Sequence, residues 1–186
     1  MISVVFVPRS FSKFYSDRLS MEHNLTNLGE VFTPRTYPDV EQRIELIERS
    51  CNQKDVLCKI NLQYLREYHP EYEHKVFDNS DTIEVIYRKD FDSQVKSLYT
   101  AIMTDSFHTE FSETKYLEFN SDVFWFSVNY LETFNKLVSE FYFANRHRNI
   151  NLTECSTLTS ERLNRPVEWV GGLPEVKSET VELFNE

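Results

Sequence analysis

Short apolar runs alternate with segments of helical periodicity in the first half of the chain. The runs ISVVFV (2–7), VLCKI (56–60) and TIEVIY (82–87) are bounded by polar residues, which is typical of buried strands. Apolar positions at helical spacing occur at 40–47 and 91–103. This alternation predicts βαβ units, and therefore an α/β fold in which a parallel sheet carries helices on its faces. Ligands of such sheets bind beyond the carboxyl ends of the strands, so functional residues are expected directly after each strand.

The second half has a more helical pattern and ends in an acidic segment. Apolar residues over 131–142 form one stripe at helical spacing, which indicates core packing. A chain of 186 residues is long enough for a single domain with a substantial core, here residues 1–186. From Pro166 onward the chain is acidic and contains two adjacent glycines, so residues 166–186 are expected to form a loosely attached tail.

The composition is that of a folded globular protein with an excess of acidic residues. The net charge of −10 disfavours nucleic acids and anionic membranes as partners, so no nucleic-acid binding is expected. No membrane span is expected either, because the chain has no run of about 18 apolar residues, and a cytoplasmic protein is predicted. Cys51, Cys58 and Cys155 are an odd number without a C-x-x-C pair, which predicts reduced, buried thiols and neither disulfides nor a zinc site.

The loop after the first apolar run carries side chains that suit an anion. In VPRSFSKF, the cations Arg9 and Lys13 lie beside the hydroxyls of Ser10 and Ser12. Such side chains can hold an anion together with the unpaired N–H groups at the start of a helix. The Walker pattern is absent because the segment contains no glycine, which disfavours ordinary ATP or GTP hydrolysis and a kinase-like enzyme. A surface turn with an N-cap serine is the alternative interpretation.

A second cluster of the same kind follows the apolar run at 82–87. In YRKDFDSQVKSLYTA, Arg88 and Lys89 come directly after the predicted strand, and Ser97 lies on the helix that follows. Cations after a strand and a hydroxyl on the next helix can converge on one phosphate group, the cations supplying charge and the hydroxyl a directed hydrogen bond. Two segments far apart in the chain therefore both suit an anion.

Both segments resemble motifs of one enzyme family. YRKDFDSQVKSLYTA resembles the R-R-D-x-x-x-Q-x-x-S-L-Y segment of bacterial sulfotransferases, and VPRSFSKF is similar to their P-R-S-G-[ST]-[ST] loop. The resemblance implies a P-loop-nucleotide-hydrolase-like fold, a three-layer α/β sandwich with a central parallel sheet. It also implies 3′-phosphoadenosine 5′-phosphosulfate (PAPS) as co-substrate, without a metal, its 3′-phosphate held by Arg88, Lys89 and Ser97. The residues implied to hold its 5′-phosphosulfate lie in the first loop: Arg9, Ser10, Phe11, Ser12 and Lys13.

Two further segments extend the resemblance. LGEVFTPR (28–35) resembles the G-E-x-F segment of the bacterial carbohydrate sulfotransferases, whose glutamate is the proposed general base, so Glu30 would take the proton from an acceptor hydroxyl. A lysine commonly ends the family's third strand, and Lys59 in VLCKIN matches it; its ammonium would offset charge on the oxygen that the sulfuryl group leaves. Arg35 and Tyr37 are candidates for the acceptor pocket by proximity to Glu30. The acceptor would be a carbohydrate, a lipid headgroup, a tyrosine or a small alcohol.

The sequence also departs from the family pattern. Phe11 stands where the loop has a glycine, and its Cβ allows a backbone amide to approach the phosphosulfate as closely only if its φ is negative. A non-catalytic nucleotide-binding or regulatory protein that retains the fold is therefore the alternative to an enzyme. The histidines do not match the histidine base of the animal enzymes, and His69 and His74, in REYHPEYEHKVF, are expected in a surface loop without a metal.

Overall fold

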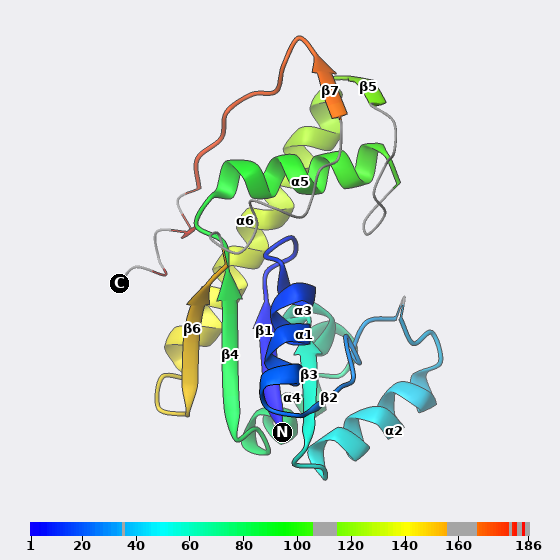
Figure 1. The fold of residues 1–186 in the computed structure, drawn as a ribbon, viewed down its shortest axis with the longest axis vertical. Helices are drawn as coiled ribbons and strands as arrows, with labels where there is room; N and C mark the ends of the chain where they lie inside the picture. Colours follow the sequence, from blue (N-terminus) through cyan, green and yellow to red (C-terminus); the bar gives the residue numbers. More distant parts are fainter. Residues whose placement is uncertain (35, 106–114, 156–166, 179, 182–183, 185–186) are drawn as a thin grey trace.

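A parallel sheet forms the centre of the protein (Figure 1). The computed structural model describes residues 1–34, 36–105, 115–155, 167–178, 180, 181 and 184. Over these residues, five strands pair in the order β2-β3-β1-β4-β6, and every pair is parallel. The strands are β2 (Thr26–Asn27), β3 (Val56–Ile60), β1 (Ile2–Phe6), β4 (Thr82–Tyr87) and β6 (Ile150–Glu154). The predicted strands at 56–60 and 82–87 are confirmed, and the first ends one residue earlier than expected.

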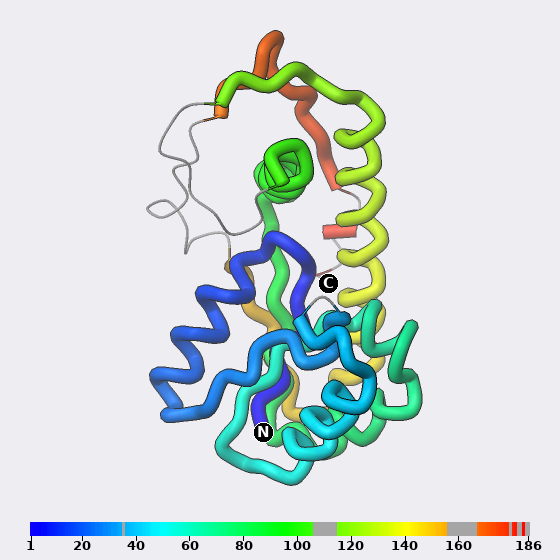
Figure 2. The backbone as a smooth tube through the Cα atoms, turned by 90° about the vertical axis from the view of Figure 1, so that its right-hand side faces the viewer, coloured from blue at the N-terminus to red at the C-terminus, as the bar shows by residue number. Residues whose placement is uncertain are grey.

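Helices cover both faces of this sheet. One face is covered by α1 (Ser12–Glu22), whose Tyr15 and Leu19 pack against Val4 and Phe6 of β1. The elements on the opposite face are α2 (Val40–Cys51), α3 (Leu62–Tyr68), α4 (Glu73–Asp78) and α6 (Ser121–Ala144). Figure 2, which views the sheet from its edge, separates α1 in blue from α6 in yellow-green. The predicted α/β architecture, with a central parallel sheet between helices, is confirmed.

The helix α5 (Phe91–Met103) lies across the carboxyl end of the sheet (Figure 1). Asp90 caps its N-terminus by accepting a hydrogen bond from the Ser93 amide at 3.0 Å. Beyond α5, β5 (Lys115–Glu118) pairs in parallel with β7 (Val167–Val170). Tyr99 of α5 stacks on Trp169 of β7, with ring centroids 4.6 Å apart. The position of α5 brings it to the edge where ligands of parallel sheets bind.

Two segments differ from the sequence-based expectation. REYHPEYEHKVF is helical, ending α3 and passing through a 3-10 turn (Pro70–Tyr72) into α4, and His69 is buried with 2% exposure. The expected surface loop is wrong because Val76 and Phe77 of α4 pack into the core, which draws the segment inward. The described part of 166–186 also packs on the molecule: Phe184 is buried, and its ring stacks on Tyr87 at 4.5 Å.

The cysteines and the helices agree with two simpler expectations. Cys51, Cys58 and Cys155 are all free and buried. Burial raises the pKa of Cys58 to about 11 and that of Cys155 to about 12, so both stay as unreactive thiols at neutral pH. Within the described ranges, none of the helices has both the length and the apolar character needed to cross a bilayer.

Candidate functional site

The β1–α1 loop has an unusual backbone. Arg9 and Phe11 have φ values of 64° and 59°, in the left-handed region that residues with a Cβ rarely adopt. Phe11 is the N-cap of α1, and the described structure gives this helix no side-chain cap. The alternative of a turn with an N-cap serine is therefore not what forms. Close approach of the Phe11 amide to an anion was expected to require a negative φ at Phe11. The φ of Phe11 is positive instead, which is a conformation that a glycine takes without strain.

Helix α5 connects the two segments that are predicted from the sequence to bind an anion. The guanidinium of Arg9 donates to Ser97 Oγ from Nε at 3.1 Å and from Nη2 at 2.9 Å. One turn earlier, Gln94 Nε2 donates to the carbonyl oxygen of Pro8 at 2.6 Å. These contacts arise because β1 and β4 are neighbours in the sheet, so the loop after β1 and the helix after β4 begin at the same edge. The structure thus brings together residues that the sequence separates by 88 positions.

Arg88 is a buried cation beside this loop. It is 9% exposed, and its guanidinium carbon lies 4.7 Å from the centroid of the Phe11 ring. Burial lowers the pKa of Arg88, although an arginine stays protonated at neutral pH. Its Nε and the fully buried Ser10 Oγ have no hydrogen-bond partner among the described residues. Unmet buried donors of this kind are rare and are satisfied when an acceptor binds. We call Arg9, Ser10, Arg88 and Ser97 the anion site.

Glu30 and Lys59 form an ion pair. Lys59 lies on β3, opposite Val4 of β1, and Glu30 lies in the segment that follows β2. The Gly29 carbonyl accepts from the Lys59 amide at 2.8 Å, which aligns the two segments. Lys59 Nζ then donates to Glu30 Oε1 at 2.8 Å. The carboxylate and the ammonium that sequence reasoning assigned to proton transfer and charge neutralisation are therefore in direct contact.

Other residues expected in the site lie elsewhere or on its margin. The side chain of Lys13 is 72% exposed, and its ammonium pairs with Asp17 at 2.7 Å. The ammonium is therefore not brought to the anion site. Lys89 is exposed, whereas Ser12, the first residue of α1, is 8% exposed. Tyr37 packs partly buried against the main core. Arg35 lies outside the described residues.

Sequence reasoning assigned no role to two residues that the geometry brings in. Gln94 is the glutamine of the quoted motif and is fully buried, with its Oε1 unpartnered in the described part of the chain. Thr33 is 7% exposed and donates from Oγ1 to Glu30 Oε2 at 3.1 Å. The motif itself contained a signal for Gln94, since the quoted pattern has a fixed glutamine at this position. Thr33 had no such signal.

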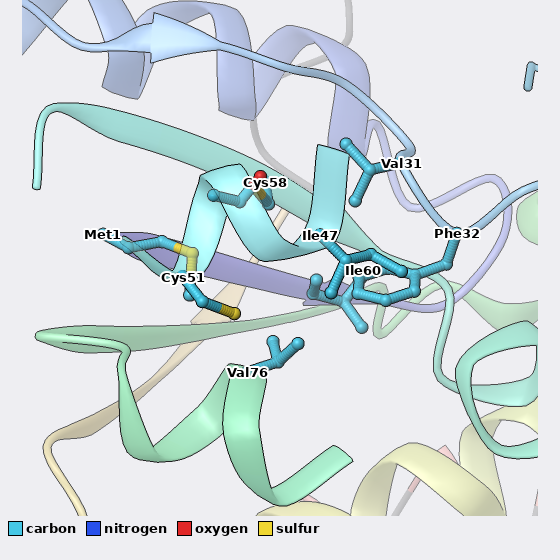
Figure 3. Close-up of a pocket in the computed structure, with 9 residues that line it drawn as sticks. Met1, Val31, Phe32, Ile47, Cys51, Cys58, Ile60 and Val76 are labelled. Carbon is cyan, nitrogen blue, oxygen red and sulfur yellow. The ribbon is translucent and has the colours of Figure 1, made fainter. Parts of the chain in front are cut away.

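The apolar gap drawn in Figure 3 is not part of this site. It lies between β3, α2 and α4 and has no room for a water-sized molecule. Its lining is apolar except for Ser50, and none of the lining residues belongs to the anion site or to the ion pair: Met1, Val31, Phe32, Ile47, Ser50, Cys51, Cys58, Ile60 and Val76. A gap of this kind is a packing imperfection of the core and not a binding site.

The arrangement at the carboxyl edge offers the kinds of groups that bind phosphate and transfer protons in proteins. The anion site supplies guanidinium and hydroxyl donors, and the Glu30–Lys59 pair supplies a carboxylate beside a cation. Among the described residues, histidine, cysteine and carboxylate side chains form no group of three or more that could hold a metal ion. Comparisons with protein-family models, curated proteins and solved structures find no match to this chain.

Proposed function

We propose that this protein is a sulfotransferase that transfers a sulfuryl group from PAPS to an acceptor hydroxyl. The observation that carries this proposal is the meeting of the two anion-binding segments, through the hydrogen bonds from Arg9 to Ser97. The buried, unmet donors of Ser10 and Arg88 support it, because phosphate oxygens would accept from both. The motif resemblance selects PAPS among phosphate ligands. The parallel sheet is compatible with the P-loop-nucleotide-hydrolase-like fold that the proposal implies.

Each phosphate of PAPS has its own set of donors in this proposal. Ser10, Ser12 and the uncapped N-terminus of α1 hold the 5′-phosphosulfate, as the loop motif implies. Arg88 and Ser97 hold the 3′-phosphate, with Lys89 at its exposed side. The protein has a net charge of −10, but the cationic side chains of the site attract the nucleotide at short range. The repulsion from distant acidic residues is screened over about 8–10 Å. Arg9 belongs to the first loop by sequence, and its guanidinium contacts Ser97 of the second set.

The reaction is an in-line displacement at sulfur. The acceptor oxygen forms a bond to sulfur while the bond from sulfur to the bridging phosphate oxygen breaks, giving a sulfate ester and 3′-phosphoadenosine 5′-phosphate. Glu30 takes the proton that the acceptor hydroxyl loses. Lys59 offsets the negative charge that the leaving phosphate oxygen gains. The acceptor is a molecule with a free hydroxyl: a carbohydrate, a lipid headgroup, a tyrosine or a small alcohol.

A second candidate is a nucleotide-binding or regulatory protein without turnover. Phe11 favours it, because its ring packs against the Arg88 guanidinium and its Cβ occupies a left-handed position of the loop. In that case the anion site binds the nucleotide, but no sulfuryl group is transferred. Activity measurements with PAPS separate the two candidates, whereas binding measurements test what they share.

The shared test is calorimetric titration with 3′-phosphoadenosine 5′-phosphate, the product nucleotide, beside AMP, which lacks the 3′-phosphate. We expect clear preference for the nucleotide that carries both phosphates, since Arg88 and Ser97 contact the second one. Absence of binding to either nucleotide would reject both candidates. A screen of hydroxyl acceptors with PAPS then decides between enzyme and binding protein.

The role of Glu30 gives a direct prediction about turnover. Glu30→Gln removes the base without removing a cofactor contact, so we expect the rate of transfer to fall by about 10²–10⁴-fold without weaker nucleotide binding. The rate is measured as release of product nucleotide under saturating PAPS. An equal loss of rate and of nucleotide affinity would identify Glu30 as a structural residue instead.

A further inference from the structure

Both oxygens of the Glu30 carboxylate are engaged in this structure. Oε1 accepts from Lys59 Nζ at 2.8 Å, and Oε2 accepts from Thr33 Oγ1 at 3.1 Å. The Thr33 amide also donates to the Glu30 carbonyl at 3.2 Å, so this short turn fixes the carboxylate relative to its own backbone. Each oxygen of the carboxylate therefore has one lone pair occupied by a hydrogen bond from the protein, and the one on Oε1 is held by a cation.

The two partners of Glu30 differ in how they can move. Thr33 is buried, and its hydroxyl is tied to Glu30 by the turn. Lys59 is anchored on the central strand β3, but its ammonium is the end of a flexible four-carbon side chain. Its side chain is 8% exposed, whereas that of Glu30 is 30% exposed. The ammonium is therefore the shielded partner on a side chain with several rotatable bonds, and the carboxylate is the partner held by the turn and open to solvent and acceptor.

The position of Lys59 gives its ammonium a second direction to turn. Lys59 Nζ lies 4.7 Å from the centroid of the Phe6 ring, the last residue of β1. The loop with Ser10 begins two residues beyond that strand end, after Val7. The ammonium thus contacts Glu30 and lies beside the last residue of the strand that leads into this loop, and a doubly charged phosphate bound at the loop would attract it more strongly than a single carboxylate.

We propose that Lys59 exchanges partners when the nucleotide binds, and that this exchange prepares Glu30 to act as a base. In the nucleotide-free protein Lys59 occupies Glu30 Oε1. When the 5′-phosphate group enters the anion site, the Lys59 ammonium turns to it, Oε1 becomes free to accept a proton, and Thr33 keeps Oε2 oriented. This inference rests on the proposed function, since it concerns the regulation of that same site. The exchange requires the donor nucleotide to bind before the acceptor hydroxyl can give its proton to Glu30.

The exchange has a measurable cost for nucleotide binding. To turn toward the phosphate, Lys59 must leave Glu30, so removal of the Glu30 charge makes binding tighter. We expect Glu30→Gln to bind 3′-phosphoadenosine 5′-phosphate about three- to tenfold more tightly than the unaltered protein, the range of a partly exposed ion pair. Adenosine 3′-monophosphate, which has no 5′-phosphate, is the ligand control, and its affinity should not change.

A matched variant separates the ion pair from the change in net charge. Glu48 of α2 pairs with Lys75 of α4, and neither residue belongs to the site. Glu48→Gln makes the same change in net charge and opens an ion pair elsewhere, so both nucleotides should bind it as they bind the unaltered protein. Glu30→Asp, which keeps the charge but shortens the side chain, is the second variant at the site and should also tighten binding of the bisphosphate.

The outcomes distinguish this inference from the proposed function. Tighter binding of the bisphosphate by both Glu30 variants, with unchanged binding of the 3′-monophosphate, supports the exchange. Unchanged or weaker bisphosphate binding by the Glu30 variants, while the unaltered protein binds it well, overturns the exchange and leaves the proposed function standing. No binding of the bisphosphate by the unaltered protein rejects the proposed function, and the exchange with it.

Discussion

Arg88 is the residue at which binding and stability make opposite demands. A buried guanidinium with an unmet Nε is unfavourable for the folded protein, because its desolvation is not fully compensated. The same unmet donor is favourable for a phosphate ligand. The proposed binding role of Arg88 accounts for this position, whereas packing of the folded protein does not.

Replacement of Arg88 tests this conflict. Arg88→Met keeps the length of the side chain and removes the charge, so affinity for 3′-phosphoadenosine 5′-phosphate should fall by about 10- to 100-fold, as for the loss of a charged hydrogen bond. The free energy of unfolding should not fall. Arg66→Met, which removes an exposed arginine paired with Glu73, is the control and should not change nucleotide affinity. Calorimetry and urea denaturation provide the two readings, and unchanged affinity for Arg88→Met would reject the assignment.

His69 shows how burial fixes a protonation state. Its Nε2 accepts from Arg43 Nε at 3.3 Å, and both side chains are buried. Burial and the Arg43 charge lower the pKa of His69 below the ordinary value of 6.5, against a smaller opposite effect of Glu71. The imidazole is therefore neutral in the folded protein. Arg43 Nη1 in turn donates to the carbonyls of Tyr37 and Pro38, which secures the segment after Glu30.

This lowered pKa predicts a pH dependence of stability. Above pH 6.5, His69 is neutral in both the folded and the unfolded chain and has no effect. Below about 6.5 the unfolded chain binds the proton first, so the free energy of unfolding should decrease as the pH falls towards the pKa of the folded state. His69→Gln should reduce this slope between pH 6.5 and 5, whereas His74→Gln, at an exposed position, should leave it. Urea denaturation at several pH values measures both, and an unaltered slope for His69→Gln would contradict the prediction.

At the scale of elements, α5 is the part of the fold that holds the β1–α1 loop. Its N-terminus is fixed by Asp90, whose pKa is held below its ordinary value: burial opposes this, but the hydrogen bonds from Ser93 and the charges of Arg88 and Lys96 prevail. From this fixed end, Gln94 and Ser97 reach the loop after β1. The left-handed residues of the loop need such support, because each left-handed non-glycine residue costs on the order of 1 kcal/mol or more.

Gln94→Met tests whether this support matters for binding. The variant keeps the length of the side chain and loses the hydrogen bond to the Pro8 carbonyl, so the loop should be less well ordered. We expect about three- to tenfold weaker binding of the bisphosphate nucleotide with a loss of roughly 1 kcal/mol in the free energy of unfolding. Asn52→Ala, which removes an exposed amide hydrogen bond to Glu48, is the control for binding. A loss of stability without any loss of affinity would show that Gln94 acts on the fold alone.

At the scale of the whole molecule, the C-terminal segment belongs to the main core. Val181 and Phe184 are 5% exposed, and the Phe184 ring stacks on Tyr87 at the end of β4, next to Arg88 in the sequence. The amide of Val176 donates to Asp92 of α5 at 3.2 Å. The segment therefore packs against both the strand and the helix that carry the second predicted anion-binding motif.

Phe184→Ala should destabilise the protein as a core substitution does. The loss of a buried aromatic ring near the strand end should lower the free energy of unfolding by about 2–4 kcal/mol. Phe126→Ala, at a residue of α6 that is 57% exposed, should change it by less than about 0.5 kcal/mol. Urea denaturation gives both values, and equal small effects would mean that the end of the chain contributes nothing to the folded state.

The sequence predicted the central elements well and the peripheral ones poorly. The strands at 56–60 and 82–87 are apolar runs because both of their faces are buried, which is the pattern that identifies them. β6 was missed because INLTE lies at the sheet edge with mostly half-exposed residues and has no such run. Phe184 was missed because a single aromatic residue in an acidic segment has no periodic pattern.

The candidate site was predicted in part for the same kind of reason. Cations directly after a strand are a local feature, so Arg9 and Arg88 could be identified from the chain alone. The exposed side chain of Lys13 could not, because the direction of the first helical turn depends on the left-handed Phe11 before it. The contact between Glu30 and Lys59 was also hidden, since it depends on the pairing of β2 with β3.

The sequence by itself determined where the buried strands of the sheet form, and that basic and hydroxyl side chains follow them, because these features depend on neighbouring residues. The tertiary structure decided which of them meet. Placing β4 beside β1 brings Ser97 to Arg9, and placing β2 beside β3 brings Glu30 to Lys59. Strand order arises from packing between residues far apart in the chain, and no local pattern encodes it.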